Sequence, residues 1–288
     1  EAVNRMDAGD TCFFRGGRYR QSLILSNKDN LTFRAYENEQ VIFDGTIPLV
    51  TSWTQHSGNI YQTPVSADFW QLFADEQMMM PARWPNAALS DESVWDQPGH
   101  WAKVIYSSSK TDFVDDPTAH SNLQQLNFSV QGSIAVLAVG SFKSYAREIL
   151  NHTAGSPNFT VSAVGNRKAS NYQYYFLEGL LEFLDSPGEW YLDRENDILY
   201  VWGDTNAAFF GKTQDYAFNF SNCDDITISD IDFFGTTVRF NNCQRSVVEN
   251  GTFSFPSCTK RMLGESGDQP EMTEFTGGGN HHFYNNVV

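Results

Sequence analysis

One pattern is written twice between residues 218 and 253, and this repeat limits the possible folds more than any other feature. The letters FSNC at 220–223 return as FNNC at 240–243, an offset of 20 residues. Apolar Ile226 and Ile228 alternate around Thr227, which is strand periodicity. One short strand and a turn every 20 residues or so fit the coils of a parallel β-helix, a solenoid whose coils stack about 4.8 Å apart. The alternative is an antiparallel sandwich that repeats by accident.

The ends of the repeats add detail to this prediction. Asp230 and Asn250 fall where the chain must bend between strands, a position that Asp and Asn tolerate. A third, weaker copy, FYNNVV at 283–288, matches VENGTF at 248–253. The chain opens at Glu1 without a methionine and closes at Val288 inside this strand-like run. We therefore expect a fragment of a longer polypeptide, with coils that continue beyond residue 288.

Charge narrows the possible partners. The net charge is −16 and the pI is about 4.6, which argues against nucleic acid and anionic membrane surfaces as partners. No run of 18 apolar residues exists, so no membrane span is expected. A polyanionic sugar chain would need local basic residues or bound calcium to approach this surface. Asp224 and Asp225 are weak calcium ligand candidates, and no cofactor or metal site is assigned with any confidence.

Six Asn-X-Ser/Thr sites suggest N-linked glycans and a secreted, extracellular protein. Glycosylation of Asn250 conflicts with the tight turn that is expected at this residue. The sites are Asn30, Asn127, Asn151, Asn158, Asn219 and Asn250.

The four cysteines lack zinc-finger spacing. Cys223 and Cys243 occupy equivalent positions in successive copies of the repeat. Stacked neighbours lie within the Cα separation that a disulfide requires. The alternative is a pair of inward-facing free thiols, because cysteine packs well as a small hydrophobic residue. The sequence leaves both possibilities open.

Two stretches near the N-terminus resemble a known group of proteins. GDTCFFRGGRYR at 9–20 and VIFDG at 41–45 look like the opening coils of right-handed parallel β-helix proteins of the pectate-lyase-like kind, which include polysaccharide lyases and glycoside hydrolases. Residues 69–86 and 187–202 resemble an antiparallel β-domain that interrupts the helix in a subset of them. The resemblance implies β-helix coils over 1–66, an inserted antiparallel sheet or sandwich over 67–215, and resumed coils over 216–288. Within the insertion, 177–184 is expected to form a short helix.

Catalytic candidates are weak. Glycosidases need two carboxylates that face one groove, and Glu249 is one candidate among many acidic residues. The resemblance implies that a lyase would use Lys or Arg as its base, which directs attention to Lys260 and Arg261 on a looped segment. His281 and His282 should alternate inward and outward, and the outward one is a candidate acid–base residue. Solvated surface charge, or for a histidine burial or plain surface exposure, is the more common explanation of each of these residues.

Two tryptophans in the long loop around residues 90–125, Trp95 and Trp101, are candidates for stacking on sugar rings.

Two functions fit these sequence features together. The first is a secreted, glycosylated β-helix protein with a polysaccharide lyase or glycosidase scaffold that binds or cleaves extracellular polysaccharide. The second is a structural extracellular glycoprotein that self-assembles into filaments or matrix without catalysis. Whether the chain is an enzyme stays open at this point.

Overall fold

The computed structural model describes residues 3–105, 108–140, 143–165, 173–267 and 273–288, and this part of the chain is almost entirely β-structure. The expectation of an all-β protein is confirmed. Helical elements are short: η1 (Val3–Arg5), η2 (Ser93–Trp95), α1 (Gln97–His100), η3 (Leu123–Gln125), η4 (Leu181–Phe183) and η5 (Arg261–Leu263). Among the described residues, no helix has the length and apolar character needed to cross a membrane.

The chain divides into two compact units. Unit 1 comprises Glu1–Pro48, Phe210–Thr259 and Pro270–Val288, and unit 2 comprises Leu49–Phe209 and Lys260–Gln269. The sequence placed the first boundary at residue 66, but residues 49–66 belong to unit 2 because their strands join an antiparallel sheet there. The chain enters unit 2 a second time over Lys260–Gln269, which the sequence did not predict.

Unit 1 contains three parallel sheets, each assembled from strands far apart in sequence. The first parallel sheet has the order β1 (Thr11–Phe14), β4 (Leu31–Ala35), β23 (Ile226–Ser229), β26 (Val247–Glu249) and β29 (His282–Tyr284). The second has the order β2 (Gly17–Tyr19), β5 (Val41–Asp44), β24 (Asp232–Phe234) and β27 (Phe253–Ser254). The third has the order β28 (Glu274–Gly279), β25 (Thr237–Gln244), β22 (Tyr216–Ser221) and β3 (Leu23–Ser26).

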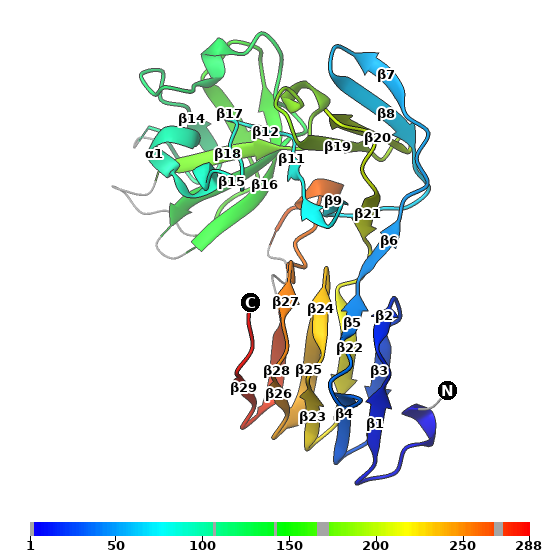
Figure 1. Cartoon of the computed structure of the whole chain (residues 1–288). Helices are drawn as coiled ribbons and strands as arrows, with labels where there is room; N and C mark the ends of the chain where they lie inside the picture. The colour runs from blue at the N-terminus through cyan, green and yellow to red at the C-terminus, as the bar shows by residue number, and fades with distance from the viewer. Residues whose placement is uncertain (1–2, 106–107, 141–142, 166–172, 268–272) are drawn as a thin grey trace. The chain divides into compact units, whose positions relative to one another are not determined.

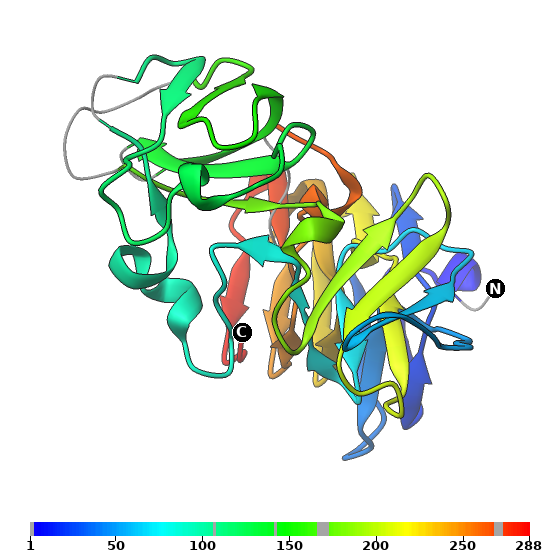
Figure 2. The ribbon, with the colours of Figure 1, turned by 90° about the horizontal axis from the view of Figure 1, so that it is seen from above.

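The pairing register explains the sequence repeat. Phe220 pairs in parallel with Phe240, and Phe233 pairs with Phe253. The 20-residue offset is therefore the distance along the chain from a strand to its neighbour in the same sheet. The same register continues across the insertion, since Leu25 of β3 lies beside Phe220. In Figures 1 and 2 the blue N-terminal strands accordingly lie beside the yellow strands that follow the insertion.

Bends between the sheets are built from residues in the left-handed backbone region. Asp230, Asn250 and Asn285 occupy equivalent bends with φ of 60°, 58° and 54°. This confirms the turn positions expected for Asp230 and Asn250, because Asx side chains tolerate this conformation better than most residues. The side chains also bond between turns: the Asn250 amide donates to Asp230 Oδ1 at 3.1 Å.

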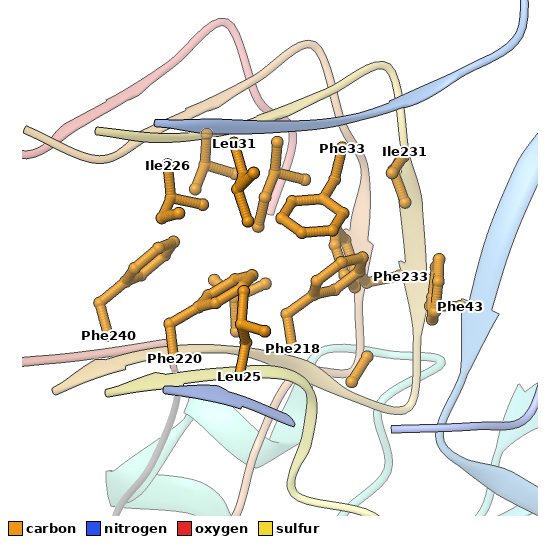
Figure 3. Close-up of a cluster of buried hydrophobic side chains, with 14 of the residues drawn as sticks. Leu25, Leu31, Phe33, Phe43, Phe218, Phe220, Ile226, Ile231, Phe233 and Phe240 are labelled. Carbon is orange, nitrogen blue, oxygen red and sulfur yellow. The ribbon is translucent and has the colours of Figure 1, made fainter. Parts of the chain in front are cut away.

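The core of unit 1 lies between the three parallel sheets and is rich in phenylalanine (Figure 3). Phe218 is fully buried, and its ring centroid lies 4.6 Å from that of Phe43 and 5.8 Å from that of Phe33. The rings also form a column from one strand to the next, as for Phe240 and Phe275 at 5.3 Å. Strand alternation sends these residues inward and leaves the polar neighbours outside.

Cys223 and Cys243 point into this core and are free thiols. The Cys223 amide donates to Cys243 Sγ at 3.4 Å, and burial raises the pKa of both thiols. The structure therefore contains the inward-facing thiols, not the disulfide that the sequence left open.

Unit 2 contains antiparallel sheets and shorter pieces. One sheet has the order β11 (Met80–Pro81), β19 (Glu189–Asp193), β20 (Ile198–Trp202), β8 (Ile60–Pro64) and β7 (Thr54–Ser57), in which only β11 is parallel to its neighbour. Another follows the path β12 (Arg83–Trp84), β18 (Tyr174–Glu178), β15 (Ile134–Gly140), β16 (Lys143–His152), β17 (Asn158–Val161) and β14 (Asp112–Val114), with β13 (Ala102–Lys103) also on β18.

The remaining strands form one four-stranded sheet in the order β10 (Gln77–Met78), β9 (Leu72–Ala74), β21 (Phe209–Lys212) and β6 (Thr46–Pro48). The helix expected over 177–184 is wrong, because Leu177 lies in β18 and only residues 181–183 form a 3-10 turn. Leu177 is fully buried in the sheet, so burial of an apolar strand decided its conformation.

Candidate functional site

The outward side chains of the first parallel sheet form rows, because its strands are in register. One row consists of Arg34, Ser229, Glu249 and Tyr284. Asp230 and Asn250 stand at the bend that follows. We call these six residues the first-sheet face. Neighbouring strands lie about 4.8 Å apart, so the face presents a regular series of polar groups, one set for each strand.

Asp230 is held by three donors on this face. Arg34 Nη2 lies 3.1 Å from Oδ2, Ser229 Oγ donates to Oδ2 at 2.7 Å, and the Asn250 amide donates to Oδ1 at 3.1 Å. The side chains of Arg34 and Asp230 are 44% and 34% exposed. The carboxylate is therefore fixed in position and still reachable from solvent.

Glu249 stands one strand further along and is partly exposed. The Tyr284 hydroxyl donates a short hydrogen bond to Glu249 Oε2. This bond raises the pKa of Tyr284. Glu249 is thus oriented by a neighbour from the next strand of the sheet.

Hydrolysis of a glycosidic bond commonly requires two carboxyl groups that face the same bond. One group protonates the leaving oxygen, and the other acts as nucleophile or base. Asp230, at the bend that follows β23, and Glu249 of β26 supply the residue types that this chemistry needs. Arg34 and the amide of Asn250 supply hydrogen-bond donors beside them. The same face could bind sugar hydroxyls without any reaction.

The third parallel sheet has a comparable outward cluster around one carboxylate, Glu274. It contacts Arg239 Nε at 3.0 Å, the Tyr216 hydroxyl at 2.9 Å and Thr276 Oγ1 at 2.7 Å. These donors lower the pKa of Glu274. Among the described residues of β22, β25 and β28, the register places Asn219 and Arg239 in the same row as Glu274 and no second carboxylate.

Lys260 and Arg261 lie in unit 2 and not with Glu249. Lys260 Nζ lies 4.6 Å from the ring centroid of Trp70. Arg261 Nε lies 3.0 Å from Oε2 of Glu178, which is buried. Both cations are engaged inside unit 2, which favours an anchoring role for the segment that carries them.

The two histidines alternate as expected. His282 is exposed and pairs in register with Val247, next to the row that contains Glu249. His281 turns the other way, with its ring centroid 4.8 Å from that of Phe275. Burial lowers the pKa of His281. Of the two, only His282 lies on the outer side of the sheet that carries the first-sheet face.

The calcium candidates are paired with an arginine. Arg245 contacts Asp225 Oδ1 at 2.6 Å and Asp224 Oδ2 at 3.3 Å. Among the described residues, no group of three or more His, Cys, Asp or Glu side chains is arranged to hold a metal ion.

The sequons differ in accessibility. Asn30, Asn127, Asn151, Asn158 and Asn250 are exposed, whereas Asn219 is half-buried. The amide of Asn250 already bonds to Asp230, and a glycan would replace a hydrogen of that nitrogen.

The two loop tryptophans also differ. The side chain of Trp95 is 78% exposed. Trp101 is half-buried, its Nε1 donates to the carbonyl of Val94 at 3.1 Å, and its ring packs edge-on against Phe176. Only Trp95 presents a free ring face.

Unit 2 contains buried ionisable groups that sequence reasoning missed. Asp115 is completely buried and accepts hydrogen bonds from the Tyr175 hydroxyl and the Leu123 amide, both at 2.7 Å. Desolvation raises the pKa of Asp115 to about 7. Glu189 is also buried, and desolvation raises its pKa to about 8. Tyr175 is 60 residues from Asp115 and Arg83 is 106 residues from Glu189, so no local pattern could reveal these contacts.

No protein-family model matches this sequence, and no curated protein matches it. Among solved structures, one described as "Glycoside hydrolase" is similar, with a TM-score of 0.54, 12% identity and coverage of 88% of this chain. At this identity the likeness shows a shared fold and nothing more. This chain spans 59% of the length of that protein.

Two weaker likenesses carry no argument. A structure described as "The complex structure of XylC with xylose" has a TM-score of 0.39 and 13% identity over 89% of this chain and 37% of that one. A tailspike of an Acinetobacter baumannii bacteriophage in complex with capsular saccharide has a TM-score of 0.21 and 6% identity over 87% of this chain and 37% of that one.

Proposed function

We propose that unit 1 is a right-handed parallel β-helix interrupted by the inserted unit 2, and that the protein binds and cleaves a polysaccharide on the first-sheet face. The observation that carries the proposal is that Glu249 of β26 and Asp230, at the bend that ends the neighbouring strand β23, are each held by a side chain from another strand. Each carboxyl group is held by a donor from another strand, Arg34 and Tyr284 respectively. Preorganised groups of this kind are what acid–base catalysis requires.

The fold likeness to a glycoside hydrolase supports the proposal. The register supports it as well, since polar groups that recur at each strand suit a ligand that is itself a linear repeat. The acidic surface, with a net charge of −16, favours a neutral sugar chain over a polyanionic one.

The test is hydrolysis of a polysaccharide panel, followed by the release of reducing ends. We expect Asp230→Asn and Glu249→Gln each to lower kcat/KM by at least about 100-fold, because general acid–base catalysis typically contributes 10² to 10⁴. Glu274→Gln is the matched control, since it removes a carboxylate with similar partners from the third parallel sheet. Equal activity in all three variants would exclude the first-sheet face as the reaction site.

We also propose that the protein is secreted and carries N-linked glycans, which the exposure of Asn127 and Asn158 supports. In a eukaryotic expression host we expect these two to be occupied and Asn250 to be free, because its amide nitrogen is bonded to Asp230. Mass spectrometry of peptides after enzymatic deglycosylation in heavy-oxygen water reads each site separately. A fully occupied Asn250 would contradict this expectation.

A further inference from the structure

Trp95 lies in unit 2 on a turn whose backbone is held by hydrogen bonds. The turn that carries it is closed by the Trp95 amide, which donates to the Glu92 carbonyl at 3.0 Å, and by the Ala88 amide, which donates to Ser93 Oγ at 2.8 Å. Trp101 braces the turn from the side through its bond to the Val94 carbonyl. The backbone under the ring is therefore fixed, and yet the ring itself is 78% exposed.

Such exposure is unusual for tryptophan. Tryptophan is highly buried on average in folded proteins, and it is enriched at interfaces, where its ring meets a partner. The side chain adds little to the packing of unit 2, because the buried residues of this turn are Ser93 and Val94. A role outside the core of unit 2 accounts better for this residue.

The residues next to Trp95 in the chain are polar. Asp91, Glu92 and Asp96 are exposed, and Asp96 Oδ2 lies 3.2 Å from His100 Nδ1. Asp91 accepts a hydrogen bond from the Ser93 amide at 3.0 Å. Two of the three carboxylates thus already have donors, and their remaining lone pairs are acceptors suited to hydroxyl groups.

We propose that Trp95 is a sugar-binding platform in unit 2, on which the C–H face of a pyranose ring stacks while its hydroxyls bond to the carboxylates of Asp91, Glu92 and Asp96. An exposed apolar ring with exposed acceptors on neighbouring residues of the chain is complementary to a sugar, which has C–H groups on its faces and hydroxyls at its edge. The inference rests on the proposed function, and it gives unit 2 a binding contact of its own for the same class of polysaccharide. The platform binds the chain but takes no part in bond cleavage.

The experiment is native gel electrophoresis of the full chain through gels that contain xylan, pectate or a sulfated polysaccharide, with retardation as the measure of affinity. Trp95→Ala is expected to weaken binding at least about tenfold, equivalent to about 1.4 kcal/mol. Trp95→Phe should retain part of the affinity, because a ring face remains. Leu150→Ala is the matched control: Leu150 is also an exposed apolar residue of unit 2, at 46%.

Each outcome decides the question. Loss of retardation in Trp95→Ala, with the leucine variant unchanged, supports the platform. Equal retardation of both variants overturns it, and the proposed function stands if Glu249→Gln still abolishes cleavage. If no polysaccharide retards the wild-type protein, the platform is overturned, and absence of cleavage in the panel assay separately overturns the proposed function. A response of Trp95 fluorescence to tetramethylammonium but to no sugar would reassign the site to a cation.

Discussion

Replacing Phe218 by alanine is expected to lower the free energy of unfolding of unit 1 by about 3–5 kcal/mol. Phe218 is completely buried, and its ring lies against rings from all three parallel sheets, including Phe33 and Phe233. Neighbours on a regular sheet cannot move in to fill the space, because each is fixed by its own pairing. The variant therefore loses the transfer free energy and retains most of the cavity.

Denaturation with urea can separate this effect from changes in unit 2. All seven tryptophans lie between residues 53 and 202, within unit 2, so tryptophan fluorescence follows that unit while circular dichroism follows both. We expect the dichroism transition to shift to lower urea. Ile24→Ala, on a residue of the third parallel sheet that is 70% exposed, should change stability by less than about 0.5 kcal/mol. A Phe218→Ala transition that coincides with wild type would contradict the described core.

Unit 2 is expected to become less stable as the pH rises from about 4 to about 7, because of Asp115. Its pKa is raised to about 7 by desolvation, whereas an unfolded aspartate has a pKa of about 3.9. Between these values the folded state binds more protons than the unfolded state, so stability falls with rising pH. Each unit of pKa difference is worth about 1.4 kcal/mol, which makes the expected total a few kcal/mol.

Asp115→Asn should remove this part of the pH dependence, because the amide keeps a carbonyl acceptor for Leu123 and offers a donor to the Tyr175 oxygen. The measurement is urea unfolding at a series of pH values, read by tryptophan fluorescence. Asp116→Asn is the control with the opposite sign, since a hydrogen bond from Thr118 lowers the pKa of Asp116. Parallel pH profiles for wild type and Asp115→Asn would show that Asp115 is not the source.

The part of the fold that is encoded by the 20-residue repeat could be predicted from the sequence. The pairing of Phe220 with Phe240 and the bends at Asp230 and Asn250 follow from periodicity and from the backbone preferences of Asx residues. The boundary near residue 49 could not be predicted in the same way. Strands β7 and β8 are as short as those of unit 1. They pair with each other, and it is the antiparallel partner of β8, β20, more than 130 residues later, that joins them to unit 2.

The candidate site shows the same limit. Glu249 and His282 were candidates from the sequence, and they lie in adjacent rows of one sheet. Arg34 and Asp230 are 196 residues apart in the chain, and their ion pair exists because β4 and β23 are neighbours across the insertion. A strand register that spans an inserted domain has no signal in the local sequence. Lys260 and Arg261 stood out as a basic pair, but their partners Trp70 and Glu178 are equally remote.

The chain departs for the insertion and resumes afterwards at almost the same point, since Pro48 of β6 lies opposite Phe210 of β21. Paired antiparallel strands are about 4.8 Å apart, so the gap left by excising the intervening domain is short enough for a tight connection. The parallel ladders of unit 1 therefore do not depend on the path of the chain through residues 49–209, whereas the segment Lys260–Gln269, which also belongs to unit 2, would lose partners such as Glu178 if those residues were exchanged or removed.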